Sequence, residues 1–154
     1  SPMTTDPHDP MHIAMIAAEA AAARGEVPVG AVVVGPDGKI VAQAGNRTLE
    51  LKDPTAHAEM LAIREAAAAL NNERLTGCDL YVTLEPCAMC AGAISFARIR
   101  TLHFAASDPK MGGVLHGGRF FEQPTCHHRP EIEQGHLAHA SADLLKAFFR
   151  ARRG

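Results

Sequence analysis

Two cysteines and one histidine have the residue types and the spacing that a metal ion needs. Cys87 and Cys90 stand three residues apart, so on a helix they share one face and two thiolates can bind one ion. Pro86 predicts a helix start there, where the helix N-terminus stabilises thiolates. His57 opens another predicted helix and can supply the third ligand. Three protein ligands leave one position of a tetrahedral zinc ion open, which is typical of catalytic zinc.

Glu59 follows His57 by two residues and is a candidate for moving protons. In the middle of a helix the two side chains would point about 200° apart. At a helix start the first residue is not yet held to helical geometry, so both side chains can reach one cavity. Zinc lowers the pKa of a bound water to about 7. We therefore expect Glu59 to be a catalytic acid and base rather than a ligand.

The joint pattern carries more weight than either of its parts. A Cys-x-x-Cys pair alone is often redox-active or without special function, and a His-x-Glu pair alone indicates little. Together, each at a predicted helix start after a proline-bearing turn, they match the signature of zinc deaminases. We expect one zinc ion per chain. Cys126, His127 and His128 are a second possible metal group, but no predicted helix begins at these residues.

Length and charge limit the classes of protein that fit. The 154 residues predict a single domain over residues 11–154, after a disordered, proline-rich segment 1–10 in which Ser1-Pro2 is consistent with a cloning remnant. No window reaches the roughly 18 consecutive apolar residues of a membrane helix, and no signal peptide is recognisable. We expect no membrane association and a cytoplasmic location. The net charge of −2 means that any contact with RNA depends on a local patch.

Helical and extended patterns alternate along the chain. β-branched runs and turn residues predict strands at 29–34, 39–44, 80–84 and 100–106, the first two forming a hairpin. Apolar periodicity predicts helices at 11–24, 56–70, 86–97 and 138–152. Residues 45–55 are expected to form a loop, and so are residues 107–128, with a short helix near Phe120. This alternation predicts an α/β layered domain.

Several segments beyond the metal motif carry a resemblance to a known family. Residues 26–31, 45–47, 53–59, 81–93, 108–110, 123–128 and 148–153 resemble those of bacterial tRNA-specific adenosine deaminases, within the cytidine deaminase-like superfamily. The resemblance extends over roughly residues 11–153. It implies a three-layer α/β/α sandwich with a five-stranded mixed sheet and a homodimer. It also implies conversion of adenosine to inosine at the wobble position of an arginine tRNA anticodon.

The same resemblance implies roles for residues outside the metal motif. Asn46 matches a base-contacting asparagine, and Ala58 matches a residue whose backbone N–H meets the nucleobase. The positions near the anticodon stem-loop are Asp108, Lys110, Phe149, Arg150, Arg152 and Arg153.

Each of these residues also has an ordinary structural explanation. Asn46 can be a turn residue, and the three arginines can simply complement a helix C-terminus. Lys110 can be a solvated loop cation, and Asp108 is more typical of a hydrogen-bond acceptor within a loop. Phe149 is expected in the core rather than on a stacking surface, because Phe148 and Phe149 are adjacent and only one can face inward.

Two other functions remain open at this point. A guanine deaminase, or another deaminase of free bases or nucleotides, would share the metal motif but would not need the basic helix end at residues 148–153. A zinc-stabilised RNA-binding module without activity would not need Glu59 beside an open metal position. Detection of inosine in tRNA distinguishes all three.

Overall fold

A five-stranded mixed sheet forms the centre of the computed structural model, which describes residues 6–153. Its strands are β1 (Gly30–Val34), β2 (Ile40–Gly45), β3 (Asp79–Leu84), β4 (Thr101–Ala106) and β5 (Glu131–Gln134). They lie in the order β2-β1-β3-β4-β5. β1 is antiparallel to both β2 and β3, whereas β3, β4 and β5 run parallel to one another.

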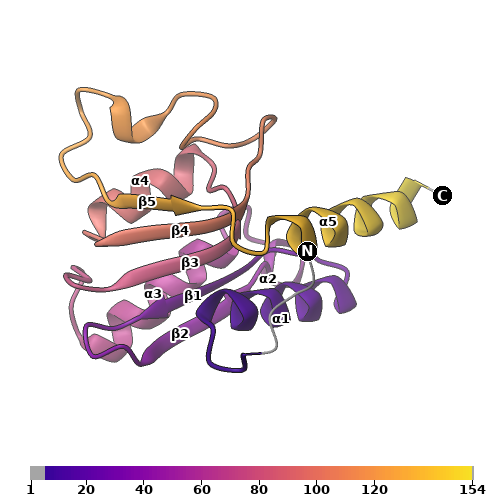
Figure 1. Ribbon diagram of the computed structural model, residues 1–154, viewed down its shortest axis with the longest axis horizontal. Coiled ribbons are helices and arrows are strands. Elements are labelled where there is room, and N and C mark those ends of the chain that lie inside the picture. The colour runs from indigo at the N-terminus through magenta and orange to yellow at the C-terminus, as the bar shows by residue number, and fades with distance from the viewer. Residues whose placement is uncertain (1–5, 154) are drawn as a thin grey trace.

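Helices cover both faces of this sheet and complete the predicted three layers (Figure 1). They are α1 (Pro10–Ala23), α2 (Thr48–Leu51), α3 (Ala58–Leu70), α4 (Ala88–Phe96) and α5 (Ala138–Arg153), with a short 3-10 helix η1 (Phe120–Glu122). α1 and α5 pack on one face, while α3 and α4 pack on the other. The C-terminal part of α5 extends past the ends of the strands (Figure 1).

The central strand β1 is buried along its whole length, because helices cover it on both sides. Val32 belongs to one core cluster together with Met15 of α1, and Val33 belongs to the other cluster together with Ala62 of α3. Successive side chains of a strand point to opposite faces, so one Val-rich run serves both layers. At Gly30 a Cβ atom would lie 1.9 Å from the carbonyl oxygen of Ala14, so this position allows α1 to approach the sheet closely.

The predicted elements are present, with boundaries shifted by one or two residues, but the residue patterns did not locate α2 or the fifth strand that the resemblance implies, β5. β5 is an exposed edge strand with a polar sequence that lacks a strand pattern, and it forms by parallel pairing with β4. α2 lies within the segment that was predicted to be a loop, and its own N-cap residue, Arg47, makes no side-chain cap. The carboxylate of Glu26 supplies the missing acceptors from outside this helix.

The N-terminal prediction falls partly outside the described residues. Residues 1–5 lie outside the described residues, whereas Asp9 caps α1 and Pro10 is the first residue of this helix. No helix in the described part of the chain combines the length and the apolar character that a bilayer crossing needs.

Candidate metal centre and substrate pocket

The three predicted metal ligands meet at the starts of two neighbouring helices. His57 is the N-cap residue of α3, and Cys87 is the N-cap residue of α4. Both have extended backbone angles and neither side chain caps its own helix, so both are available to other partners. The ligand atoms of His57, Cys87 and Cys90 all lie within 4.8 Å of one another, the only such group of three in the described residues.

These distances fit a zinc ion closely. Nδ1 of His57 lies 3.7 Å from Sγ of Cys87 and 3.5 Å from Sγ of Cys90. Around a tetrahedral zinc ion, with usual bond lengths, a nitrogen and a sulfur ligand stand about 3.6 Å apart. Thiolate and imidazole are also the donors that zinc prefers. His57, Cys87 and Cys90 therefore form a site for one zinc ion per chain.

One of the two cysteines is prepared for metal binding by its neighbours. The hydrogen bond from the Cys90 thiol, together with contact with His57, lowers the pKa of Cys87 to about 4. The same hydrogen bond and burial raise the pKa of Cys90, so without a metal ion this thiol keeps the proton. Metal binding to the pair therefore releases a proton.

Glu59 lies beside the ligands in a fully enclosed position. Its residue is only 4% exposed, and it shares a hydrogen bond with Cys90 and interacts electrostatically with His57 without joining the ligand group. Burial raises the pKa of Glu59 to about 7, because a carboxylate loses solvation there. Near neutral pH this carboxyl group can either accept or donate a proton.

Asn46 bridges the end of β2 and the start of α3. Its Oδ1 accepts a hydrogen bond of 2.8 Å from the backbone N–H of Ala58, and its residue is 9% exposed. The N–H for which the resemblance implies a nucleobase contact is therefore bonded to Asn46 in this structure. This bond fixes the side chain of Asn46 directly next to His57 and Glu59.

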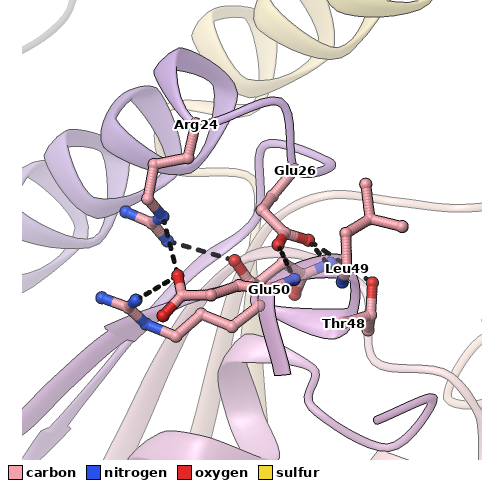
Figure 2. A network of polar contacts seen from close by, with 7 residues as sticks. Arg24, Glu26, Thr48, Leu49 and Glu50 are labelled. Carbon is pink, nitrogen blue, oxygen red and sulfur yellow. Dashed lines mark hydrogen bonds and ion pairs between the residues drawn. The ribbon is translucent and has the colours of Figure 1, made fainter. Parts of the chain in front are cut away.

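The segment that follows Asn46 is held by residues at the end of α1. Figure 2 shows the side chains of Arg24 and Glu26, at the C-terminal end of α1, pointing toward α2. Glu26 is 2% exposed and accepts hydrogen bonds from the backbone N–H groups of Leu49 (3.2 Å) and Glu50 (2.9 Å). Arg24 donates to the backbone carbonyl of Asn46 at 3.1 Å. This segment, which lies beside the metal ligands, is thus held by hydrogen bonds from residues that are distant in the sequence.

A pocket of about 690 Å³ opens above the metal ligands. His57, Cys87, Glu59 and Asn46 line it. Most of the residues predicted to lie near RNA also line it, namely Asp108, Lys110, Phe149, Arg152 and Arg153. Ala58 and Arg150 do not, although Arg150 lines an adjoining hollow with Phe149 and Arg153.

The aromatic pair on α5 corrects one expectation. Phe148 is 7% exposed and packs inward, whereas Phe149 is 45% exposed and lines the pocket. The expected core position of Phe149 is therefore wrong, because the docking of α5 on the sheet turns the preceding residue inward. Arg152 lies over the Phe148 ring, with 3.6 Å between its guanidinium carbon and the ring centroid.

The loop of residues 108–116 forms the opposite wall of the pocket. Oδ1 of Asp108 accepts hydrogen bonds from the backbone N–H groups of Lys110 (3.2 Å) and Met111 (3.1 Å). Asp108 thus has the loop-acceptor role that its sequence context favours. Lys110 is exposed at the mouth.

Three further residues line the pocket although they lie outside the matched segments: Thr48, Met111 and Leu145. Thr48 and Met111 directly follow the matched segments 45–47 and 108–110, which was the only signal available. Leu145 becomes a pocket residue solely through the docking of α5.

The second possible metal group has a structural role in the described residues. Cys126 is buried, and its Sγ lies 3.5 Å from Oγ of Ser95. Nε2 of His128 lies 2.6 Å from the carbonyl oxygen of Ile99. These contacts attach the segment before β5 to α4 and its C-terminal end, and they leave Cys126 and His128 outside any group of three metal ligands in the described part of the chain.

The arrangement of fold and ligands agrees with a known class of protein. The family model of the cytidine and deoxycytidylate deaminase zinc-binding region matches residues 4–106. This stretch includes the sheet from β1 to β4 and all three ligands. The class defined by fold and site is thus that of the zinc-dependent deaminases.

Individual relatives narrow this class. The chain is 57% identical over 143 residues to tRNA-specific adenosine deaminase of Agrobacterium fabrum, covering 93% of each chain. It is 48% identical over 143 residues to the protein of that name from Aquifex aeolicus, again covering 93% of each. A structure solved in studies of A-to-I editing by tRNA:A34 deaminases at the wobble position of transfer RNA superposes with a TM-score of 0.87 at 57% identity, covering 88% of this chain and 98% of that one. The chain belongs to the family of tRNA-specific adenosine deaminases.

Proposed function

We propose that this enzyme converts adenosine to inosine at the wobble position of a tRNA anticodon. In this reaction water replaces the C6 amino group of adenine, which leaves as ammonia. The observation that carries the proposal is that one pocket joins the metal ligands His57 and Cys87 to the basic end of α5. An RNA strand bound at the pocket mouth can therefore place one of its bases next to the metal ligands. With such a substrate, we also propose that the enzyme acts in the cytoplasm.

The chemistry depends on the metal and on one carboxyl group. When zinc is bound by His57, Cys87 and Cys90, it supplies the Lewis acidity that activates water at neutral pH. Glu59 moves the protons. Its pKa of about 7, raised by burial, allows it to take a proton from the attacking water and to pass it to the departing amine.

Recognition of the base depends on Asn46 and on an unstacked substrate. Because Oδ1 of Asn46 accepts from Ala58, its Nδ2 amino group is the donor left for an acceptor nitrogen of the purine. An adenine inside a helix cannot reach the pocket, so the target base must be turned out of its strand. The single-stranded anticodon loop makes this inexpensive.

The RNA backbone meets cations at the pocket mouth. The pocket is lined from two sides by Lys110, Arg152 and Arg153, and Arg150 extends the basic surface along α5. The exposed ring of Phe149 offers a surface on which an unpaired base can stack. The net charge of −2 makes this local patch necessary for binding.

The direct test is incubation of the purified zinc-loaded protein with an arginine tRNA that carries adenosine at the wobble position. Mass spectrometry of the digested tRNA should find inosine in place of this adenosine. Free guanine, supplied in parallel, should remain unchanged. Rapid deamination of guanine without inosine in tRNA would make the protein a guanine deaminase, and tight RNA binding without either product would make it a binding module.

The enzyme is further proposed to be a homodimer. Phe96 on α4 is 83% exposed, and Met89 on the same helix is 37% exposed. Large apolar side chains on a surface helix favour contact with a partner, and a second copy agrees with the resemblance. Sedimentation at micromolar concentration should give the mass of a dimer, and Phe96→Asp should shift it toward the monomer. A single active monomer in the parent protein would contradict this proposal.

A further inference from the structure

Glu85 is a buried carboxylate that the proposed reaction does not use. It lies between the end of β3 and the ligand Cys87, and its side chain has no exposed surface. A buried carboxylate is costly unless hydrogen bonds replace its lost solvation. The partners of Glu85 therefore indicate what this residue is for.

All of these partners come from the loop of residues 108–116. Oε1 of Glu85 accepts from the backbone N–H of Asp108 at 2.9 Å and lies 2.8 Å from Nδ1 of His116. Oε2 accepts from the backbone N–H groups of Val114 (3.1 Å) and Leu115 (2.9 Å). Both oxygens are thus occupied by one loop, and neither is left for a substrate.

The same loop packs tightly against the turn that carries the metal ligand. The backbone N–H of Gly113 donates to the carbonyl oxygen of Pro86 at 2.8 Å. A Cβ atom on Gly112 would lie only 2.3 Å from Oε2 of Glu85, so no side chain fits there. Glu85 therefore connects the turn of Cys87 to the residues of the loop that face the pocket, which include Lys110.

We propose that Glu85 is a positioning residue that holds the loop of residues 108–116 at the pocket mouth, so that Lys110 meets the RNA backbone. Glu85 acts through the loop and sets the affinity for RNA without touching it. This inference rests on the proposed function, because it assumes an RNA substrate. It assigns to a residue next to the metal site a role in binding rather than in the chemical step.

Glu85→Gln tests this role with little change of volume. The amide keeps one acceptor oxygen but turns an NH₂ group toward backbone N–H groups, so the loop loses part of its attachment. With an anticodon stem-loop as substrate, KM should rise about ten-fold while kcat per bound zinc stays close to that of the parent. A merely structural role would lower the active, zinc-loaded fraction and leave KM unchanged.

A double-mutant cycle with Lys110→Ala shows whether Glu85 affects RNA binding through the position of Lys110. Lys110→Ala should raise KM in the parent, but clearly less in the Glu85→Gln background, because the lysine is already displaced. Glu26→Gln is the matched control, since Glu26 also accepts backbone N–H groups but holds the opposite wall. In that background Lys110→Ala should keep its full effect.

Gly112→Ala disturbs the same contact from the side of the loop and replaces Glu85→Gln if that variant fails to fold. It should reproduce the rise in KM. The proposal is overturned if kcat per zinc falls at constant KM, if the Lys110 effect is equal in all backgrounds, or if Lys110→Ala leaves KM unchanged. Absence of inosine with the parent protein would instead refute the proposed function, whatever the variants do.

Discussion

The metal ligands and the C-terminal arginines belong to the same pocket, but they are held in different ways. His57, Cys87 and Cys90, with Glu59 beside them, form a metal floor at two helix N-termini, where ligand distances of 3.5 and 3.7 Å already match zinc. Arg150, Arg152 and Arg153 form an arginine rim on the last turns of α5, exposed and past the ends of the strands (Figure 1). The comparison indicates that the floor depends on geometry and the rim on charge.

This difference has a physical reason. Replacement of an amino group requires water, base and proton carrier in one fixed arrangement, which buried helix starts provide. Attraction of a phosphate backbone depends on the number of cations and on salt, and exposed arginines serve it well. Changes to the floor should therefore remove turnover, and changes to the rim should weaken binding.

The largest effect is expected at the floor. Cys87→Ala should lower the zinc content from about one ion per chain to near zero, because two remaining protein ligands hold zinc poorly. Metal analysis of the purified variant measures this directly. Full zinc content in the variant would show that the ligand assignment is wrong.

Glu59→Ala separates chemistry from metal binding within the floor. Turnover should fall by about 10²–10⁴-fold, since no other side chain in the ligand group is free to carry the proton. Zinc content and RNA affinity should stay at the values of the parent. Loss of zinc together with activity would instead make Glu59 a ligand.

The rim is tested by replacing Arg150, Arg152 and Arg153 together with alanine. The KM for tRNA should rise on the order of 100-fold at low salt, and the slope of log affinity against log salt should become shallower by about 2. The zinc content should not change. Deamination of tRNA as efficient as that of the parent would place the RNA surface elsewhere.

Asn46 belongs to the pocket wall between the metal floor and the arginine rim. Its replacement should have a smaller effect than replacement of the three rim arginines. Asn46→Ala removes the one proposed contact with the base edge, which corresponds to about ten-fold in turnover. Because no phosphate contact is lost, the salt slope should equal that of the parent. A changed slope at constant turnover would assign Asn46 to the rim instead.

The smallest expected effect is a change in the pH dependence of stability. It concerns Glu26, which holds the segment that follows Asn46. Burial alone would raise the pKa of Glu26, but hydrogen bonds from the backbone of Glu50 and Leu49 and from Thr48 hold it below the ordinary 4.5. The stabilisation by this carboxylate is therefore present above pH 4.5 and is lost as the pH falls through the lower folded value. Unfolding curves of Glu26→Gln should show a weaker pH dependence in this acid range than those of the parent. Equal acid dependence in both proteins would contradict this role.

The sequence predicted the metal floor better than the walls, and the reason is physical. The ligand pattern is local, because Pro86, Cys87 and Cys90 define a helix start by themselves. Glu26 and Glu85 act on segments more than twenty residues away, and their partners are backbone N–H groups that no residue type reveals. The first N–H groups of α2 are bonded through such a contact, which the sequence does not reveal, and α2 was therefore missed.

The orientation of α5 was equally hidden from the sequence. Phe148 and Phe149 are the same residue type in adjacent positions, and only the packing of the helix decides which ring is buried. The basic end of the helix was visible from Arg150, Arg152 and Arg153, but its place at the pocket of Glu59 follows from the fold alone.

The division between floor and rim is tested most directly by a single-turnover measurement at saturating anticodon stem-loop. The protein with alanine at Arg150, Arg152 and Arg153 is compared with the parent, each loaded with zinc. Once RNA is saturating, we expect equal rates of inosine formation, because the rim contributes only to binding. A rate that stays many-fold lower at saturation would show that the arginines also act in the chemical step, and it would contradict the separation of geometry from charge.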